Sequence, residues 1–262
     1  DRMVSAIDAR TRLITVPHIT FAPGFITDLE PLRRSASAHS ALLLVDAAQS
    51  VGAIDIDVRA LDIDALAVAT QKCLLGFYGF GFLWVRRSLA DKLKPGHVAR
   101  YGIDLGEGAH ETAIGPRELR FQPGALRFDL GNFNYLGAAA AQASIELLRS
   151  IRMERVETHL RSLAARLATG LLELGLPVPG GTPGEHLAHI VSVGESGGGR
   201  HYTADDPKMN ELYDHLTSNG VRLSIRRGVL RMSLGIYNDE ADVDRVVALT
   251  QDWLNKSERG GS

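Results

Sequence analysis

Short apolar runs alternate with amphipathic stretches along the first half of the chain. The apolar runs are RLITVPH (12–18), ALLLVDAAQ (41–49) and ALAVAT (65–70), and DLEPLRRSASAH (28–39) is amphipathic. Apolar runs this short predict strands that are buried on both faces, and the stretches between them predict helices. The pattern therefore favours an α/β fold with a mostly parallel sheet and helices on both faces. The run GFGFLWVRR (79–87) follows after only a short break, which predicts one antiparallel hairpin strand.

The second half of the chain predicts a separate α+β unit. A strong helical period extends from Tyr135 to Gly175, and the order strand, helix, strand, strand, helix follows it. We predict a domain boundary near Ser150, so that residues 1–150 belong to a larger domain and residues 151–262 form a small α+β domain with a flexible tail. Residues 102–125 are rich in Gly and Pro and predict a long loop.

Composition narrows the function classes. The chain has 262 residues, with 29 Lys and Arg against 31 Asp and Glu, so it lacks the basic excess of a nucleic-acid-binding protein. No apolar run reaches the ~20 residues that a membrane helix needs. The single cysteine and nine scattered histidines predict no metal site and a reducing compartment, with the cytoplasm as the default. A small molecule or another protein is the expected partner.

An aspartate and a lysine follow two neighbouring predicted strands. Asp46 ends the first run and Lys72 comes directly after the second. Ligands of open α/β sheets bind beyond the carboxyl ends of the strands, where both residues are expected. A surface aspartate with an exposed lysine is the simpler alternative. However, the neighbours of Lys72 are small or apolar, and such surroundings destabilise the charged amine and favour attack on a carbonyl. This pair is what pyridoxal 5'-phosphate requires, because a carboxylate keeps the pyridinium protonated while a lysine binds the aldehyde.

The sequence resembles a known family over nearly its whole length. The segments VDAAQSVGAIDIDVRALDIDALAVATQK, RFDLGNFNYLGAAAA and LRMSLGIYNDEADVDRV carry the resemblance. They are similar to the class V aminotransferase family of fold-type I pyridoxal-phosphate enzymes. This group contains cysteine desulfurases, isopenicillin N epimerase-like proteins and carbon–sulfur lyases.

The resemblance implies roles for residues near the two strands. Asp46 is expected at the pyridine nitrogen, Gln49 near the phenolic oxygen of the ring, and Lys72 is the implied catalytic and cofactor-anchoring lysine. Gln71 and Thr70 are expected to bind the phosphate. Gln71 stands where the family often has histidine, and Ala69 replaces a small hydroxyl residue.

Further roles implied by the resemblance fall elsewhere in the chain. His18 is expected near the cofactor, with a structural histidine at a strand end as the alternative. Gly131 and Asn132 belong to a turn that a partner subunit offers to the phosphate, and an ordinary polar turn is the alternative. Arg231 is expected to bind the substrate carboxylate, because a guanidinium fork fixes the orientation of an amino acid. Arg226 is expected at the rim of the same substrate site.

The reaction is predicted from a missing residue. A desulfurase needs a cysteine shortly before the carboxylate-binding arginine, but residues 219–233 (NGVRLSIRRGVLRMS) contain none. Cys73 stands beside Lys72 and is interpreted as a packed residue. We therefore predict β-elimination from a cysteine-type or S-substituted cysteine substrate by a carbon–sulfur lyase. An aminotransferase or epimerase-like enzyme is the alternative.

The resemblance also predicts an incomplete cofactor site. Members of the family are longer, and the part not matched here lies N-terminal and normally helps to bind the phosphate. We therefore expect a homodimer, or a hetero-oligomer with a chain that supplies this part, and no stable monomer. A non-catalytic subunit of a split enzyme is the alternative from another class.

Overall fold

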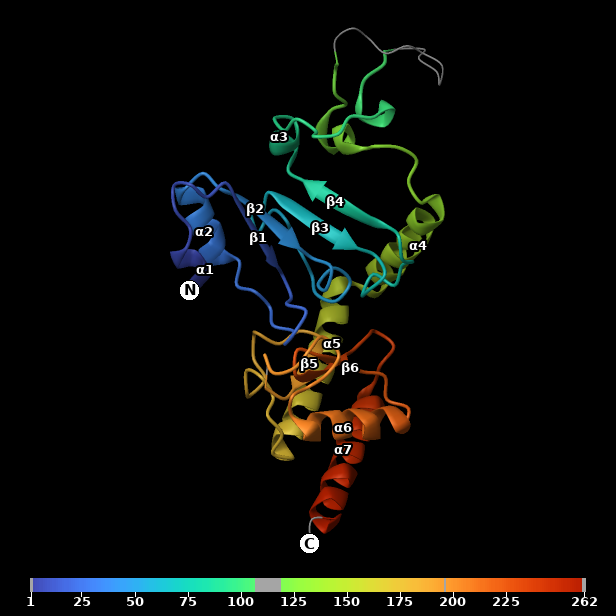
Figure 1. The fold of residues 1–262 in the computed structure, drawn as a ribbon. Coiled ribbons are helices and arrows are strands. Elements are labelled where there is room, and N and C mark those ends of the chain that lie inside the picture. Colours follow the sequence, from blue (N-terminus) through green and yellow to red (C-terminus); the bar gives the residue numbers. More distant parts are fainter. Residues whose placement is uncertain (1, 107–118, 196, 261–262) are drawn as a thin grey trace. The chain divides into compact units, whose positions relative to one another are not determined.

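The structure is a computed structural model that describes residues 2–106, 119–195 and 197–260. The chain divides into two compact units. Unit 1 consists of residues 1–16, 29–48 and 57–144, and unit 2 of residues 17–28, 49–56 and 145–262. Each unit is described by itself (Figure 1).

Unit 1 is built around a four-stranded sheet in the order β1-β2-β3-β4. Its strands are β1 (Leu13–Pro17), β2 (Leu42–Asp46), β3 (Ala65–Ala69) and β4 (Gly81–Val85). Strands β2 and β3 are parallel, with Asp46 opposite Ala67, whereas β4 runs antiparallel to β3. The predicted hairpin is confirmed. Strand β4 runs antiparallel because its connection to β3 is short, whereas a parallel strand needs a crossover connection of about a dozen or more residues.

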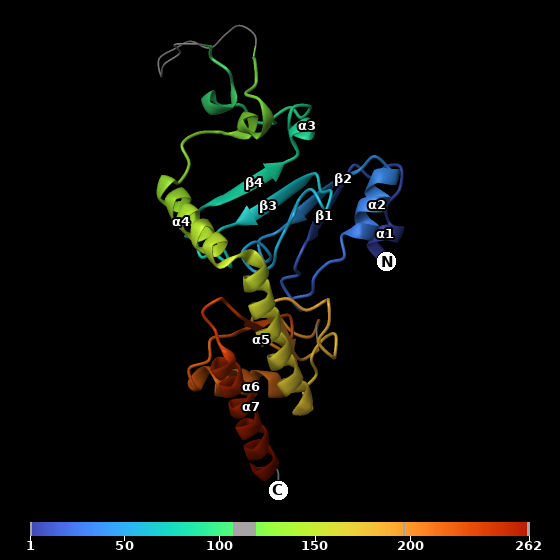
Figure 2. The ribbon, with the colours of Figure 1, turned by 180° about the vertical axis from the view of Figure 1, so that it is seen from behind.

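Short helices complete unit 1. They are α1 (Arg2–Ser5), α2 (Glu30–Ala38), α3 (Arg87–Ala90) and the 3-10 helices η1 (Arg100–Gly102) and η2 (Gly124–Phe128). Helix α2 buries Leu32 and Ala36 and contacts β2, whose Leu43 and Val45 are fully buried. Figure 2 shows α2 beside β1 and β2 from behind. Strands β1 and β2 bury alternate residues, so one face of each is buried and the other is partly exposed, which corrects the predicted burial on both faces.

The edge of the sheet at β4 carries exposed apolar side chains. Phe82 is 41% and Leu83 48% exposed, and Phe77 and Tyr78 in the preceding turn are 54% and 83% exposed. Strand β4 is the last strand in the sheet order, so one side of its backbone has no neighbouring strand among the described residues. Exposed apolar edge strands of this kind favour association with other protein surfaces.

Unit 2 is an α+β structure with a three-stranded antiparallel sheet in the order β5-β7-β6. Its strands are β5 (Ile190–Val193), β6 (Ser224–Arg226) and β7 (Val229–Ser233). Helices α5 (Met153–Glu173), α6 (Pro207–Ser218) and α7 (Glu240–Gly260) accompany the sheet, and α5 and α6 both contact α7. All four residues of β5 are buried. The predicted order of strand, helix, strand, strand, helix is confirmed.

The long helical stretch is divided into two helices. A single residue, Arg152, separates helix α4 (Tyr135–Ile151) from α5. Arg152 has a φ of 79°. A positive φ cannot continue a right-handed helix, so the chain changes direction there. Helix α7 extends to Gly260 and so includes residues that the sequence assigned to a flexible tail. Half of the predicted loop at 102–125, residues 107–118, lies outside the described residues.

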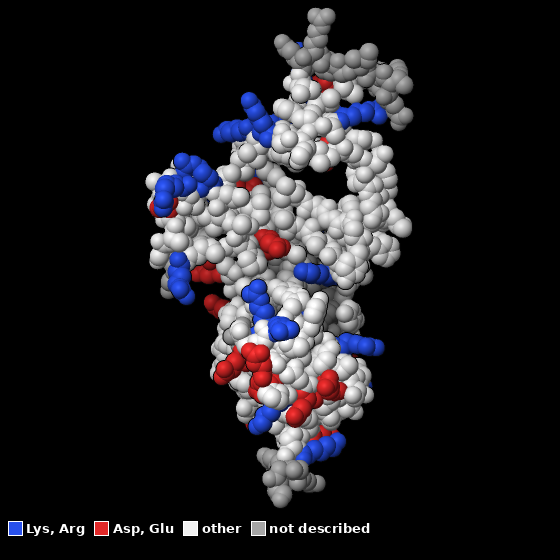
Figure 3. Space-filling view, in the orientation of Figure 1, with Lys and Arg blue, Asp and Glu red and all other residues white. Residues whose placement is uncertain are grey.

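Charged residues are dispersed on the surface. Figure 3 shows Lys and Arg interspersed with Asp and Glu on the face that it draws. None of the helices in the described residues has the length and apolar character needed to cross a membrane. Within the same residues, no group of His, Cys, Asp and Glu side chains is arranged to hold a metal ion.

Candidate active site

Asp46 lies in an open hollow on the sheet of unit 1. It is the last residue of β2, and the hollow is lined by Asp46, Ala48, Ala67, Val68, Ala69, Gly81, Phe82 and Leu83. The side chain of Asp46 is exposed, and its Oδ1 accepts a hydrogen bond from the backbone N–H of Ala48 at 2.9 Å. Four of the lining residues are alanine or glycine, so they leave room for a flat group beside the carboxylate.

Lys72 follows β3, the strand that pairs with β2. It is half-buried and lies in a tight turn, in which the N–H of Leu75 donates to the carbonyl of Lys72 at 2.8 Å. Gln71 is also half-buried. The sequence therefore places the aspartate and the lysine after adjacent parallel strands, as predicted.

Thr70 fixes the turn that carries Lys72. It is fully buried, and its hydroxyl lies within hydrogen-bonding distance of the carbonyls of Phe77 at 3.1 Å and Phe80 at 3.0 Å. The single hydroxyl hydrogen is directed to these carbonyls. A phosphate would have to compete with them for it, and the predicted phosphate-binding role of Thr70 stays a prediction.

Gly131 and Asn132 lie in unit 1 before helix α4. The Oδ1 of Asn132 accepts hydrogen bonds from the hydroxyls of Tyr101 at 2.6 Å and Tyr135 at 3.2 Å. A Cβ placed on Gly131 would meet no atom within 4 Å, so the backbone there is open to an approaching group. Their predicted role in offering a turn to the phosphate of a partner subunit stays a prediction.

Arg231 is held in unit 2 by two acceptors. Its Nε donates to the carbonyl of Phe21 at 2.7 Å, and its Nη2 donates to the Oε1 of Gln49 at 3.3 Å. Strand β7 positions Arg231, and Gln49 is buried. Gln49, predicted to contact the cofactor ring, thus contacts the predicted carboxylate-binding arginine. Hydrogen bonds to fixed acceptors restrict the side-chain rotamer of Arg231, which preorganises its guanidinium.

Aromatic rings surround the second predicted arginine, Arg226 at the end of β6. The guanidinium carbon of Arg226 lies 4.9 Å from the ring centre of Tyr202 and 5.5 Å from that of Phe21. Arg231 lies 5.2 Å from the same Phe21 ring, and His201 stacks on this ring at 6.4 Å. The structure therefore brings both predicted arginines together around Phe21. Sequence reasoning missed Phe21, His201 and Tyr202, because no motif links residues so far apart along the chain.

His18 is a buried histidine of unit 2. It is 6% exposed, and its Nδ1 has no hydrogen-bond partner among the described residues. Burial lowers the pKa of His18 below its usual 6.5, and the nearby charge of Glu157 opposes this effect while that of Arg161 adds to it. The imidazole is therefore neutral at pH 7. Both a structural role and the predicted role near a cofactor fit a neutral ring.

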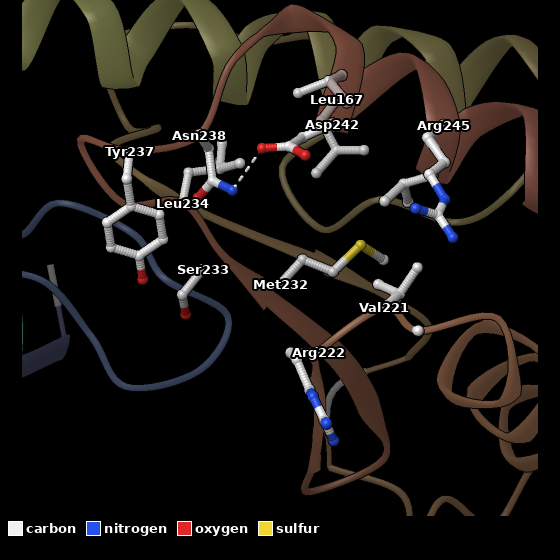
Figure 4. A pocket seen from close by; sticks show the side chains of 13 residues that line it. Leu167, Val221, Arg222, Met232, Ser233, Leu234, Tyr237, Asn238, Asp242 and Arg245 are labelled. Carbon is white, nitrogen blue, oxygen red and sulfur yellow. Dashed lines mark hydrogen bonds between the residues drawn. The ribbon is translucent and has the colours of Figure 1, made fainter.

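A separate pocket of about 340 Å³ lies between β7 and α7 (Figure 4). Its lining includes Arg222, Arg245 and Asp242 but neither Arg226 nor Arg231. At one side, the Nδ2 of Asn238 donates to the Oδ2 of Asp242 at 2.8 Å. This bond belongs to the N-terminal cap of α7, in which the N–H groups of Asp239 and Asp242 also donate to each other's carboxylates.

The chain belongs to the aminotransferase class-V family, whose sequence profile matches residues 1–246. The uncharacterized aminotransferase YcbU of Bacillus subtilis is 29% identical over 249 residues, which are 93% of this chain and 61% of that protein. A probable cysteine desulfurase of Pyrococcus abyssi is 29% identical over 248 residues, with 93% and 60% coverage. The family predicted from the sequence is confirmed. The chain spans about three fifths of the length of these relatives.

Solved structures share the fold. A cysteine desulfurase of Thermococcus onnurineus has a TM-score of 0.76 at 24% identity, over 94% of this chain and 60% of that one. The cystine C–S lyase C-DES has a TM-score of 0.79 at 19% identity, over 95% and 63%. The predicted fold class is confirmed. A variant of C-DES is described with glycine covalently linked to its PLP cofactor, and pyridoxal phosphate is the cofactor predicted here.

The residues of unit 1 fit such a cofactor. The hollow beside Asp46 is open and has a floor of small side chains, and one carboxylate oxygen of Asp46 is not engaged by the bond to Ala48. A flat aromatic ring with a protonated nitrogen needs both features. Lys72 on the adjacent strand connection supplies an amine.

Proposed function

We propose that this chain forms the larger part of a pyridoxal 5'-phosphate-dependent enzyme acting on amino acids, and specifically a carbon–sulfur lyase. One observation carries the proposal: Asp46 opens onto a hollow floored by small side chains, and Lys72 follows the neighbouring parallel strand. The family assignment and the likeness to desulfurases and to a cystine C–S lyase support it.

Unit 1 supplies the groups that hold the cofactor and move protons. When bound, the cofactor withdraws electrons from the α-carbon of the substrate. With the cofactor bound, the Asp46 carboxylate would keep a proton on the pyridine nitrogen, and the Lys72 amine would hold the aldehyde and take the α-proton of the substrate. Gln71 donates a hydrogen bond from its side-chain amide to the phosphate. In the dimer, the turn that contains Gly131 and Asn132 of the partner subunit donates to the same phosphate. His18, which belongs to unit 2, is proposed to provide a neutral ring near the cofactor.

Unit 2 supplies the groups that recognise the substrate. Arg231 binds the α-carboxylate, and its bonds to the Phe21 carbonyl and to Gln49 hold the guanidinium in one orientation. An oriented carboxylate fixes which bond of the α-carbon is labile, so a carboxylate clamp determines the reaction type as well as the affinity.

The absence of a nearby cysteine in the sequence favours elimination. Residues 219–233 contain no cysteine that could receive sulfur from the substrate. We therefore propose that the α-proton moves to Lys72, the Cβ–S bond breaks, and the sulfur leaves as a thiol. Hydrolysis of the remaining unsaturated amino acid yields pyruvate and ammonia. The substrate is a cysteine or an S-substituted cysteine.

The test combines absorbance and product analysis. The protein reconstituted with pyridoxal phosphate is expected to show the absorbance band of lysine-bound cofactor and to release equal amounts of pyruvate and thiol from S-substituted cysteines. Lys72→Ala is expected to lose both, whereas Cys73→Ser, one residue away and also half-buried, is expected to keep both. Bound cofactor without pyruvate or thiol would contradict the lyase. Loss of activity in Cys73→Ser would favour transfer of sulfur to the enzyme.

An aminotransferase or epimerase-like reaction is the second candidate. It is favoured by YcbU, a relative described as an uncharacterized aminotransferase. Turnover that depends on a keto acid would identify the aminotransferase, and inversion of the α-carbon without loss of thiol would identify the epimerase. A chain that binds no cofactor with any partner would be a non-catalytic subunit.

The proposed assembly follows from the exposed β4 edge. We propose a cytoplasmic homodimer, or a hetero-oligomer, in which further protein corresponding to the unmatched part of the relatives covers this edge. In this proposal residues 1–150 belong to the cofactor-binding domain and residues 151–262 form the small domain.

A further inference from the structure

Arg226 has the features of an unfilled anion-binding residue. Its Nη1 donates to the carbonyl of Ile225 at 2.8 Å, but its Nε is buried and has no hydrogen-bond partner among the described residues. Among the described residues, no carboxylate forms an ion pair with Arg226. A buried donor without a partner is destabilising, because it has lost its hydrogen bonds to water. A charged donor in this state therefore indicates a ligand group that completes its hydrogen bonds.

The aromatic neighbours hold Arg226 in place without neutralising it. The guanidinium contacts the rings of Tyr202 and Phe21, and His201 packs against both of these rings. Cation–π contacts with ring faces leave the N–H groups at the edge of the guanidinium available for an acceptor in its plane. Phe21 thus fixes Arg226 through its ring and Arg231 through its carbonyl.

The two arginines are close enough for one small substrate. Their guanidinium carbons lie 5.5 and 5.2 Å from the centre of the Phe21 ring, so they are no farther apart than the sum of these distances. A short amino acid with an acidic group at each end can reach both. Arg226 pairs with no carboxylate among the described residues, and its charge therefore favours a second anionic group on the substrate over a neutral side chain.

We propose that Arg226 binds a second acidic group of the substrate, so that the substrate class is an S-substituted cysteine whose sulfur substituent carries a carboxylate. This proposal rests on the proposed function, in which Arg231 binds the α-carboxylate. The guanidinium of Arg226 donates hydrogen bonds to the carboxylate, and the Phe21 and Tyr202 rings pack against the thioether chain.

The test compares two ligands that differ in one group. S-Carboxymethylcysteine and S-carbamoylmethylcysteine have nearly the same shape, but only the first has the second charge. Binding of both is measured by calorimetry to the cofactor-loaded protein in a Lys72→Ala background, which prevents turnover. We expect the acid to bind at least about tenfold more tightly, because hydrogen bonds between charged groups are the strong ones.

Matched arginine variants locate the effect. Arg226→Gln is expected to reduce the preference for the acid to about twofold or less, and Arg226→Lys to retain part of it. Arg227→Gln removes the same charge from the next, exposed residue and is expected to keep the full preference. Circular dichroism confirms that the variants are folded.

The outcomes distinguish the proposed role of Arg226 from the proposed lyase activity. Equal binding of the two ligands, binding of neither, or an undiminished preference in Arg226→Gln would overturn the role of Arg226. Pyruvate release is measured separately with Lys72 present. Preferential binding without pyruvate release would therefore retain the Arg226 site and reject the lyase, whereas pyruvate release without preference would do the reverse.

Discussion

His18 shows how a single side chain couples protonation to stability. The ring is buried in unit 2, and this burial lowers its pKa below the usual 6.5. The unfolded chain therefore takes up a proton at a higher pH than the folded chain. As a result, stability is highest above the unfolded pKa and falls as the pH decreases toward the folded pKa.

We predict that lowering the pH from about 8 to about 5.5 reduces the Tm of the wild-type protein more than that of His18→Gln. Glutamine removes the titrating group while keeping polarity, although it lowers the Tm at both pH values. Thermal unfolding followed by circular dichroism checks the difference. His97→Gln, which replaces an exposed histidine, serves as the control and is expected to retain the wild-type pH dependence. An unchanged pH dependence in His18→Gln would show that His18 does not bind the proton.

At the scale of elements, the turn between β3 and β4 determines where Lys72 lies. Gly76 packs against Thr70, and a Cβ at residue 76 would be 2.8 Å from the Cβ of Thr70 and 3.1 Å from its carbonyl oxygen. The N–H of Gly76 also donates to this carbonyl at 2.8 Å. The absence of a side chain thus allows the turn to close.

We predict that Gly76→Ala destabilises the protein by about 1–3 kcal/mol, because overpacking forces the backbone of the turn to shift. The same shift displaces Lys72 and weakens cofactor binding. Gly96→Ala, whose added Cβ would meet no atom within 4 Å, is the control and is expected to change stability by about 0.5 kcal/mol or less. Denaturant unfolding and cofactor titration measure both effects. Equal stability of the two variants would contradict the packing argument.

A network of side-chain hydrogen bonds caps the N-terminus of helix α7. Asp242 accepts hydrogen bonds from Asn238 Nδ2 at 2.8 Å and from the N–H of Asp239 at 3.3 Å, while the N–H of Asp242 donates to Asp239 at 3.0 Å. These bonds satisfy donors at the helix start, and the carboxylates interact favourably with the helix dipole.

We predict that Asp242→Ala lowers the free energy of unfolding by about 0.5–2 kcal/mol, as expected for loss of a cap. Asp252→Ala removes the same charge from an exposed position farther along α7 and is expected to have little effect. Denaturant unfolding at constant pH compares the two variants. A larger loss in Asp252→Ala would contradict the capping role.

At the scale of the whole molecule, the open edge of the unit 1 sheet at β4 is a surface suited to association. Strand β4 exposes Phe82 and Leu83, and in the part of the chain that the structure describes no further strand pairs with its outer side. Apolar side chains and unpaired backbone groups together favour contact with another protein surface.

We predict that the chain by itself associates, and that Leu83→Lys shifts it toward smaller species, because a charged residue on an edge strand opposes pairing. Met3→Lys, which adds the same charge at another exposed apolar position in α1, is expected to leave the association unchanged. Light scattering coupled to size-exclusion chromatography measures the masses. A monodisperse monomer of the unmodified chain would contradict the prediction.

Local patterns predicted much of the fold and part of the site. Short continuous apolar runs indicated β2 and β3, the short connection indicated the antiparallel β4, and helical periodicity indicated α5 and α7. Asp46 and Lys72 were found because strand ends in an α/β sheet converge on one edge. The break at Arg152 was missed, because a positive φ at an arginine has no sequence signature.

The sequence by itself determined the family, the order of the elements and the pair of Asp46 and Lys72, because these depend on residue spacing and local periodicity. Only the tertiary structure decided that Gln49 contacts Arg231 and that Phe21 lies beside both arginines. The physical reason is distance along the chain. Contacts between residues 182 to 210 positions apart arise from packing of the folded unit, and no local pattern encodes them.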